Sequence, residues 1–583
     1  MKVILLIVLF FAAVQGNWED LVVKLVDRVQ QSQVQIEQSY APPEWHEQKG
    51  IFPSQIKINF FGNPAEKLLR EYFSIFDNNM FVTVWLLEVL INAQEINPQL
   101  IHLNETVIQD GLDLLERFRD KNINSGVVDG APIYVFWSQI DKNGTWSASP
   151  DNLNRFITSG EDVLDRIGEI LKGVWLPSWG QELEDIASGL KMLSTAFLIP
   201  PDLDDSGCNL SLGSSLSRLP LYRKNFKSWL RYNSDVKQLS ERIVKYAYRP
   251  HSNDTNECSI DPRTYFFLHE YLYSRGGDDL ALMTTWVMNL EESRKSAPLG
   301  VAMPEYINNV DASVSCNIIA GLLRHLVYNT VDDSSWFTPE LQNILNDTSD
   351  YIRWVVESGR IVERPDIGML YYPSLYNFYW FASRVVFTLT QPETIALHER
   401  FPILKEMTLI WTETVRVHML DLLRSQKIED VTINSLLDAW TVSQPNTSAC
   451  SLRWIEDTPD DVRIMTERSI DWIEYAITSN SFSLGNAFFS GSIKGYPSIP
   501  NYFPANRFEF LNGTVFDHPV EGVEIYSVRG IIAEEEYEKM IQEMSSPNFE
   551  GFNATPFPYW SSEPLTLASA LAAVSKYIAL SRC

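Results

Sequence analysis

The chain has little cysteine and little positive charge for its length, and both shortages exclude classes of protein. Its 583 residues include five cysteines, and no two of them have the Cys-x-x-Cys spacing of a redox or zinc site. Lysine and arginine together number 47 against 75 aspartates and glutamates, so the formal net charge is −28. Such a surface repels phosphate groups, and we therefore expect no nucleic-acid partner and no attraction to an anionic membrane face.

Several motifs of common enzyme classes are also missing. The sequence contains no Gly-x-Ser-x-Gly elbow, no Walker loop and no Gly-x-Gly-x-x-Gly. His269-Glu270 and His398-Glu399 lack the second histidine that a zinc-binding helix needs. We therefore expect neither a cofactor nor a metal site.

The first residues are typical of a secretory signal peptide. Lys2 precedes an apolar run from Val3 to Val14, and small residues then lead to Gly16. This run is too short to span a bilayer, which takes about 20 residues, and no later segment reaches that length. We expect residues 1–16 to be removed and the chain to be secreted without a membrane span. No linker rich in proline, glycine or serine divides residues 17–583, which predicts a single large domain.

Secretion predicts N-linked glycans and permits disulfide bonds. The pattern Asn-x-Ser/Thr predicts acceptors at Asn104, Asn143, Asn209, Asn253, Asn346, Asn446 and Asn512, whereas the match at Asn553 is followed by a proline. The cysteines can form up to two disulfides and leave one thiol, with the pairing open among Cys208, Cys258, Cys316, Cys450 and Cys583. Cys316 lies in an apolar run, so we expect it to be a buried free thiol.

Helical periodicity dominates the sequence, which predicts an all-α fold with a few short strands in loops. Strand patterns occur only at Ile133–Trp137 and Val523–Val528. Amphipathic helices, with apolar residues three and four apart, are predicted near Val107–Arg119, Glu161–Trp175, Glu182–Phe197, Val462–Ile477 and Glu534–Met544.

A second kind of helix is apolar on nearly all sides and is therefore expected to be buried. Such helices are predicted to start near Asn78, Asp202, Asn308, Ser374, Thr432 and Glu563. Their alternation with amphipathic helices predicts an α/α toroid of about six hairpins, with an open helical solenoid as the alternative. A closed ring would gather aromatic residues at its mouth, namely Trp137, Trp146, Trp175, Trp179, Tyr371, Tyr372, Tyr376, Tyr379 and Trp380.

Three carboxylates stand close together at one of these helix starts, Asp202, Asp204 and Asp205. In one interpretation they repel one another, so that one keeps its proton and serves as an acid in an apolar cavity. In the other interpretation they only cap a helix and complement its dipole. The residue types allow both.

The segment Asp202-Leu203-Asp204-Asp205-Ser206 resembles the Asp-x-Asp-Asp-Thr-Ala signature of squalene–hopene cyclases and class II diterpene cyclases, which also have α/α toroid domains. The resemblance implies that Asp204 is the proton donor and that Asp202 and Asp205 hydrogen-bond around it. Ser206-Gly207 stands where the signature has Thr-Ala, and the Gln-x-x-x-Gly-x-Trp repeats of many triterpene cyclases are missing.

Two functional hypotheses follow. The first is a secreted acidic glycoprotein of the extracellular space or matrix, without catalytic activity, that would hold Ca²⁺ or matrix partners by diffuse acidic charge. The alternative is a toroid enzyme with a small-molecule or glycan ligand. It would be either a cyclase acting through Asp204 or a glycan-active enzyme with paired carboxylates, for which Asp129 is the first candidate.

Overall fold

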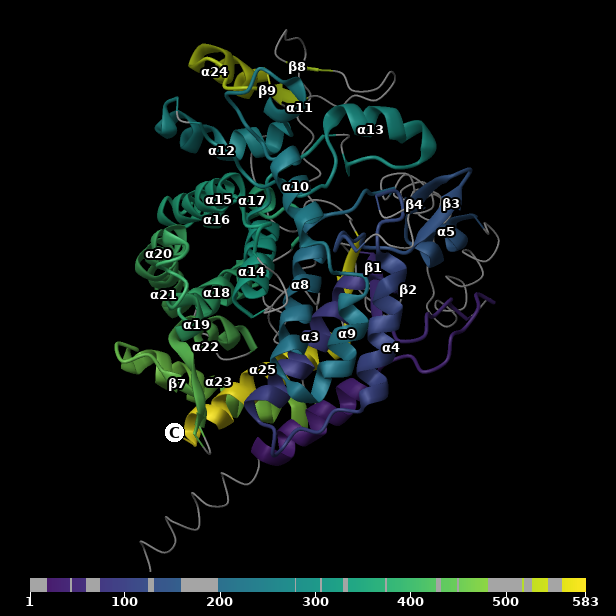
Figure 1. Cartoon of the computed structure of the whole chain (residues 1–583), viewed down its shortest axis with the longest axis vertical. Helices are drawn as coiled ribbons and strands as arrows, with labels where there is room; N and C mark the ends of the chain where they lie inside the picture. The colour runs from purple at the N-terminus through teal and green to yellow at the C-terminus, as the bar shows by residue number, and fades with distance from the viewer. Residues whose placement is uncertain are drawn as a thin grey trace, which may run out of the picture.

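The computed structural model describes residues 18–41, 44–58, 74–123, 130–158, 198–277, 279–304, 307–328, 334–372, 375–425, 431–447, 450–480, 516–517, 527–543 and 558–582. These residues are mostly helical with few short strands, which confirms the all-α prediction (Figure 1). Several predictions lie outside the described residues, among them the signal peptide 1–16, Asp129, the helices 161–175 and 182–197, and residues 523–526 of the strand predicted at 523–528.

All six helices predicted to be buried are present. Nearly every side chain in them is buried, because each is covered on all sides; in α14, for example, this holds from Ala312 to His325. They are α3 (Met80–Ile96), α8 (Leu203–Arg218), α14 (Ala312–Tyr328), α18 (Leu375–Leu389), α22 (Asn434–Trp440) and α25 (Glu563–Ser581).

The buried helices contact one another in a closed order. Helix α3 packs against α8, α8 against α14, α14 against α18, α18 against α22, and α22 against α25, which returns to α3 (Figure 1). An apolar core that includes Trp18 and Leu580 joins residues from most of the chain.

Amphipathic helices pack on the outside of the buried ones. They include α4 (Glu105–Leu115) against α3, α9 (Arg223–Leu230) against α8, α15 (Pro339–Glu357) against α14, α20 (Pro402–Leu409) against α18, and α23 (Asp460–Thr478) against α25. A π-helical turn, Ile410–Val415, joins α20 to α21 (Arg416–Ser425). The predictions of helices near 107–119 and 462–477 are therefore confirmed.

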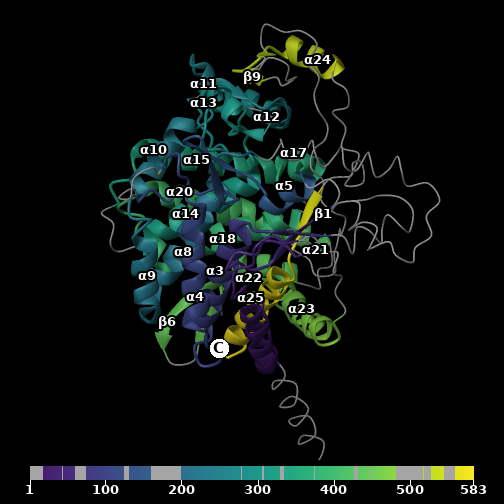
Figure 2. The same cartoon turned by 90° about the vertical axis from the view of Figure 1, so that its right-hand side faces the viewer.

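Further helices occupy the connections between these elements. They are α5 (Asp151–Thr158), α10 (Val236–Tyr246), α11 (Thr255–Cys258), α12 (Pro262–Arg275), α13 (Leu290–Ser296), α16 (Arg360–Glu363), α17 (Pro365–Gly368), α19 (Pro392–Ile395) and α24 (Glu534–Glu543), the last as predicted. Strand β9 and α24 lie at one end of the molecule beside α11 and α12 (Figure 2). There the Tyr273 hydroxyl donates to the carbonyl of Ile532 at 2.9 Å, and the rings of His269 and Tyr537 stack with centroids 3.4 Å apart.

The strands form small antiparallel sheets. Strand β1 (Ser54–Ile58) lies between β2 (Ile75–Asp77) and β10 (Pro558–Ser561), with Gln55 opposite Ser561. The other sheets pair β3 (Gln139–Lys142) with β4 (Thr145–Ala148), β6 (Thr441–Thr447) with β7 (Cys450–Trp454), and β9 (Ser527–Arg529) with β5 (Ser259–Ile260) and β8 (Phe516–Asp517).

The prediction of a strand at 133–137 is wrong. Tyr134 and Trp137 form only isolated β-bridges, because this extended segment crosses the ends of helices and finds no neighbouring strand.

Helices α8 and α14 approach each other unusually closely. A Cβ atom added to Gly321 would lie 2.3 Å from the carbonyl oxygen of Gly207, far inside van der Waals contact. Glycine at these two positions is therefore a condition of the packing, since any side chain would separate the two backbones.

Among the described helices, α25 is the one long and apolar enough to cross a membrane. However, 78% of its apolar stretch is buried inside the structure, against α3 and other elements of the core. Packing in the core accounts for this apolarity, so α25 is not a clear membrane span.

Candidate functional site

The helices α3, α8 and α14 begin at the same end of the molecule. Two extended segments, 131–137 and 282–288, cross their N-termini. In the first segment, Trp137 forms a β-bridge with Asn79 before α3, and Tyr134 forms one with Asp202 before α8. In the second segment, Trp286 forms a β-bridge with Asp202. The second segment also reaches α14, because the amide of Thr285 donates to the carbonyl of Asn309 at 3.0 Å.

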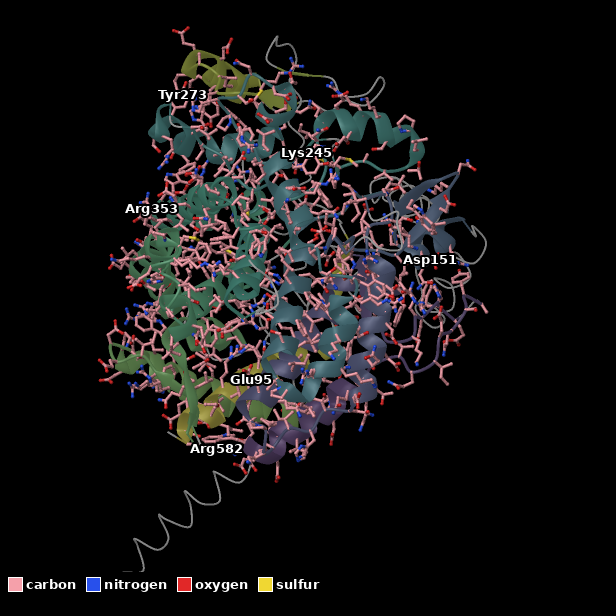
Figure 3. The ribbon with its side chains drawn as sticks, in the orientation of Figure 1. Glu95, Asp151, Lys245, Tyr273, Arg353 and Arg582 are labelled. Carbon is pink, nitrogen blue, oxygen red and sulfur yellow. The ribbon has the colours of Figure 1, made fainter. Side chains whose placement is uncertain are left out.

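The opposite ends of the same three helices also meet. Glu95, labelled in Figure 3, lies near the end of α3 and pairs with Arg218 at the end of α8, at 2.8 Å. The Arg218 guanidinium in turn lies 4.3 Å from the ring centre of Tyr328, the last residue of α14. The three helices are therefore parallel, and their positive dipole ends share one site.

Asp202 is the N-cap of α8. Its Oδ1 accepts from the amide of Asp205 at 2.8 Å, and its carbonyl accepts from the Ser206 hydroxyl at 2.7 Å. The helix-cap interpretation therefore describes Asp202 correctly.

Asp204 is not a cap, because its carboxylate leaves the helix. Its Oδ1 accepts from Asn317 Nδ2 of α14 at 2.7 Å, and its Oδ2 accepts from the hydroxyl of Tyr372, just before α18. Burial raises the pKa of Asp204 to about 6, against the hydrogen bonds from Tyr372 and Asn317 and the charge of Arg384, which lower it. The side chain is only half-buried, whereas Asp202 and Asp205 are 5% and 1% exposed. Asp204 is therefore the accessible member of the three.

Asp205 has no ordinary hydrogen-bond donor. Among the described residues, no N–H or O–H group donates to either of its buried carboxylate oxygens. The carboxyl groups of Asp202 and Asp204 lie close to it along the chain, and like charges so near one another disfavour ionisation of all three. Burial, followed by the charges of Asp202 and Asp204, raises the pKa of Asp205 well above its ordinary value. The Asp202–Asp205 pair therefore holds a proton at neutral pH.

The sequence interpretation missed two further buried carboxyl groups at helix starts, of which one, Asp311, lies near this cluster. Asp311 precedes α14 and accepts from the amides of Ser313 and Val314 at 2.7 and 2.9 Å. Burial, with a contribution from the charge of Asp204, raises its pKa to about 7. Asp77 precedes α3, and burial raises its pKa to about 6. In the sequence, Asp77 and Asp311 look like ordinary polar residues before a helix. The signal that could have pointed to them is that several apolar helices begin with similar polar residues.

Aromatic rings adjoin Asp204. The ring of Tyr372 lies edge-on to Phe381, with centroids 4.9 Å apart, and 6.0 Å from Phe81. Phe81 stacks on Trp85 at 5.5 Å. These rings therefore pack around Tyr372, whose hydroxyl contacts Asp204.

The predicted mouth aromatics are only partly brought together. Tyr371 and Tyr372 lie at the site, and the Tyr371 hydroxyl accepts from Trp286 Nε1 at 3.0 Å and Asn309 Nδ2 at 2.6 Å. Trp137 donates from Nε1 to Asp77 at 2.9 Å. The remaining residues lie elsewhere: Tyr376, Tyr379 and Trp380 are buried within α18, Trp146 is in β4, and Trp175 and Trp179 are outside the described residues.

Buried ion pairs connect most of the six helices in the interior of the molecule. Arg384 Nη2 donates to Glu88 Oε1 and Oε2 at 2.8 and 2.7 Å, and Arg324 lies 3.6 Å from Glu88. Asp438 pairs with Lys576 and accepts from Trp380 Nε1 at 3.2 Å. Each of the six helices contributes a charged side chain to the interior, namely Glu88, Asp204, Arg324, Arg384, Asp438 and Lys576.

These charges were not predicted as a group. The sequence signal that points to them is a charged residue inside a helix that is otherwise apolar on all sides, since charged side chains are rarely buried unless they are paired.

The predicted modification sites are distributed unevenly. Asn104, Asn143 and Asn253 are exposed and Asn346 is half-buried, while Asn512, Asn553 and the side chain of Asn446 lie outside the described residues. Asn209 differs from these positions, because its side chain is fully buried, accepts from Trp229 Nε1 at 3.1 Å and donates to Asn233 at 2.8 Å. We therefore expect no glycan on Asn209 in the folded chain.

Cys208, Cys258 and Cys316 are free and buried. Cys316 thus lies buried as expected, while the side chains of Cys450 and Cys583 are outside the described residues. The described part of the chain contains no group of three or more histidine, cysteine, aspartate or glutamate side chains placed to hold a metal ion.

Comparison of the chain with protein-family models, with curated proteins and with solved structures finds no match.

Proposed function

We propose that this protein is an enzyme of α/α toroid fold in which Asp204 donates a proton to a carbon–carbon double bond of a neutral, largely apolar substrate. The observation that carries the proposal is the position of Asp204. It leaves the helix cap, receives hydrogen bonds from Asn317 and Tyr372, and lies beside buried carboxyl groups and aromatic rings.

The closed order of contacts among α3, α8, α14, α18, α22 and α25 supports the toroid. In this arrangement the six buried helices form the inner ring, and the amphipathic helices form the outer ring. The N-termini of α3, α8 and α14 would surround the mouth, where Asp204 lies.

The surroundings of Asp204 favour proton donation. When the O–H bond of the acid breaks and a C–H bond forms on the substrate, a carboxylate remains. The donors Asn317 and Tyr372 already point at that carboxylate and stabilise it, which makes Asp204 a stronger acid. Burial acts in the opposite direction and keeps its pKa near 6, so that part of the enzyme is protonated near neutral pH.

Protonation of a double bond leaves a carbocation. In the proposed reaction the rings of Tyr372, Phe381 and Phe81, which pack together next to Asp204's partner Tyr372, stabilise that positive charge by cation–π interaction. The reaction also requires that water be kept away, since water would otherwise capture the cation. The neighbouring carboxyl groups Asp202, Asp205 and Asp311 would repel an anionic substrate, which favours a neutral one.

The resemblance to class II cyclases assigns the same role to Asp204. The glycan-active alternative rests on Asp129, which lies outside the described residues, and no described contact favours it. The non-catalytic alternative treats Asp204 as a structural residue, so it predicts that removing the proton of Asp204 changes no activity.

Turnover of a neutral polyene tests the proposal. We would incubate squalene or geranylgeraniol in detergent micelles in D₂O with the wild-type protein, with Asp204→Asn and with Asp254→Asn. Asp254 is the exposed N-cap of α11 and is a matched control for the loss of a capping carboxylate.

We expect the wild-type protein and Asp254→Asn to form cyclised product carrying deuterium on carbon, and Asp204→Asn to form at least about a hundredfold less. Equal turnover by wild type and Asp204→Asn, or no deuterated product from either polyene, would overturn the proposal.

A further inference from the structure

We infer that Arg384 is a positioning residue for Asp204 and acts through the side-chain amide of Asn317. Arg384 Nη1 donates to Asn317 Oδ1 at 3.3 Å, and Asn317 Nδ2 donates to Asp204 Oδ1 at 2.7 Å. The inference rests on the proposed function for its catalytic meaning, while the three side chains and their contacts are independent of it.

The chemistry of the two neighbours fixes the orientation of the amide. A guanidinium offers only donors, and an ionised carboxylate offers only acceptors. Asn317 therefore satisfies both neighbours in one orientation, with its oxygen toward Arg384 and its nitrogen toward Asp204. The reversed amide would place an acceptor against the carboxylate and donors against the guanidinium.

Arg384 is itself held in place on two sides. Its Nη2 contacts both carboxylate oxygens of Glu88, at 2.8 and 2.7 Å, and its guanidinium lies 4.2 Å from the ring centre of Trp85. The side chain is 8% exposed. Glu88, in the middle of α3, therefore holds Arg384 in one orientation. Arg384 in turn orients the Asn317 amide, which donates to Asp204.

The consequence for the acid is a stabilised conjugate base. With Arg384 in place, the Asn317 amide presents a donor to Asp204 before any proton leaves, so no reorganisation is needed at that moment. Without Arg384 the amide can rotate, and Asp204 loses this donor for part of the time.

Titration of Asp204 tests the inference without any substrate. For each variant, the spectrum of the same variant with Asp204→Asn added is subtracted, which leaves the infrared band of the protonated Asp204 carboxyl group. Three variants are compared with the wild type: Arg384→Lys, Asn317→Leu and the two combined. Arg384→Lys keeps the positive charge but removes the planar guanidinium. Arg324→Lys is the matched control, because the described contacts of the Arg324 guanidinium are with Glu88 and Ser215 and not with Asn317.

We expect Arg384→Lys and Asn317→Leu each to move the titration of Asp204 upward by about one pH unit. The combined variant should move it no further than Asn317→Leu alone, since both changes remove the same hydrogen bond. Arg324→Lys should leave the titration in place.

The inference is overturned if Arg384→Lys leaves the titration of Asp204 unchanged, or if the two single effects add in the combined variant. Where Arg384→Lys does not fold, Glu88→Gln combined with Arg384→Gln removes both charges together, and the same upward movement is expected. Failure of polyene turnover would contradict the proposed function and would leave this result standing.

Discussion

Arg384 and Glu88 meet in a buried ion pair although they lie 296 residues apart, with Arg384 Nη2 2.8 Å from Oε1 and 2.7 Å from Oε2. They belong to α18 and α3, which are not neighbours in the closed order of the six helices. The pair therefore spans the interior, and the helices that carry it are held together across the middle of the molecule as well as side by side.

Replacing Glu88 by Gln should destabilise the fold strongly. The change leaves the guanidinium groups of Arg384 and Arg324 buried without their carboxylate, and breaking a buried pair costs about 3–5 kcal/mol. The free energy of unfolding from urea denaturation measures this. Asp461→Asn is the control, because it removes an exposed pair with Arg424 and should cost less than about 1 kcal/mol. Equal effects of the two changes would show that the interior pair contributes no more than a surface pair.

Replacing Asp311 by Asn should flatten the dependence of stability on pH. The pKa of Asp311 is about 7 in the folded chain against an ordinary value of 3.8, so the folded state binds more protons than the unfolded state between these values. The free energy of unfolding of the wild type therefore falls as the pH rises from about 4 to about 7, by roughly 2–4 kcal/mol from this group.

Asparagine keeps the cap at position 311 but has no proton to lose, so this part of the fall disappears in Asp311→Asn. Urea denaturation of both proteins at about pH 4 and about pH 7 measures the difference. Asp254→Asn, a change at an exposed cap, should retain the wild-type pH dependence. A parallel fall in Asp311→Asn and wild type would contradict the burial of an ionisable group at this position.

Gly321→Ala should destabilise the contact of α8 with α14. The new Cβ would lie 2.3 Å from the Gly207 carbonyl oxygen, and the backbones must separate, which costs about 1–3 kcal/mol or more. The matched control is Gly277→Ala, where no atom lies within 4 Å of the added methyl group. That change should alter the free energy of unfolding by less than about 1 kcal/mol. Thermal unfolding measures both variants, and equal effects of Gly321→Ala and Gly277→Ala would contradict the close approach of α8 and α14.

Glycan occupancy tests the placement of the acceptor asparagines. In material secreted from eukaryotic cells, mass spectrometry should find glycans at exposed positions such as Asn143, in the turn between β3 and β4, and Asn253. Asn209 should be unmodified, because its amide is buried against Trp229 and Asn233. A glycan on Asn209 in folded protein would place the start of α8 at the surface and contradict the site.

The sequence was most informative where burial alone determines structure. Helices such as α3 and α14 are apolar on nearly all sides, so their existence and burial could be predicted from composition. The strand predicted at 133–137 failed because a short apolar run looks the same whether it pairs with strands or crosses helix ends. The pairing of β1 with β10 was beyond local patterns, because the two strands lie about 500 residues apart in the chain.

The site was predicted in part for a similar reason. Neighbouring residues such as Asp202, Asp204 and Asp205 are visible as a cluster, but the cap Asp202 and the half-buried acid Asp204 cannot be told apart until the backbone directions are known. Tyr372 lies 168 residues from Asp204, and no spacing rule connects them. Contacts of this kind depend on how helices pack, which local sequence does not determine.

The most direct measurement for the central claim is the titration of Asp204 itself in the wild-type protein. The infrared difference between wild type and Asp204→Asn, followed with pH, reports when this one carboxyl group loses its proton. We expect a protonated carboxyl band at about pH 5 that disappears with a midpoint at a pKa of about 6, because burial raises the pKa of Asp204. A midpoint near 4, the ordinary value of an exposed aspartate, would contradict the claim that Asp204 is a buried acid.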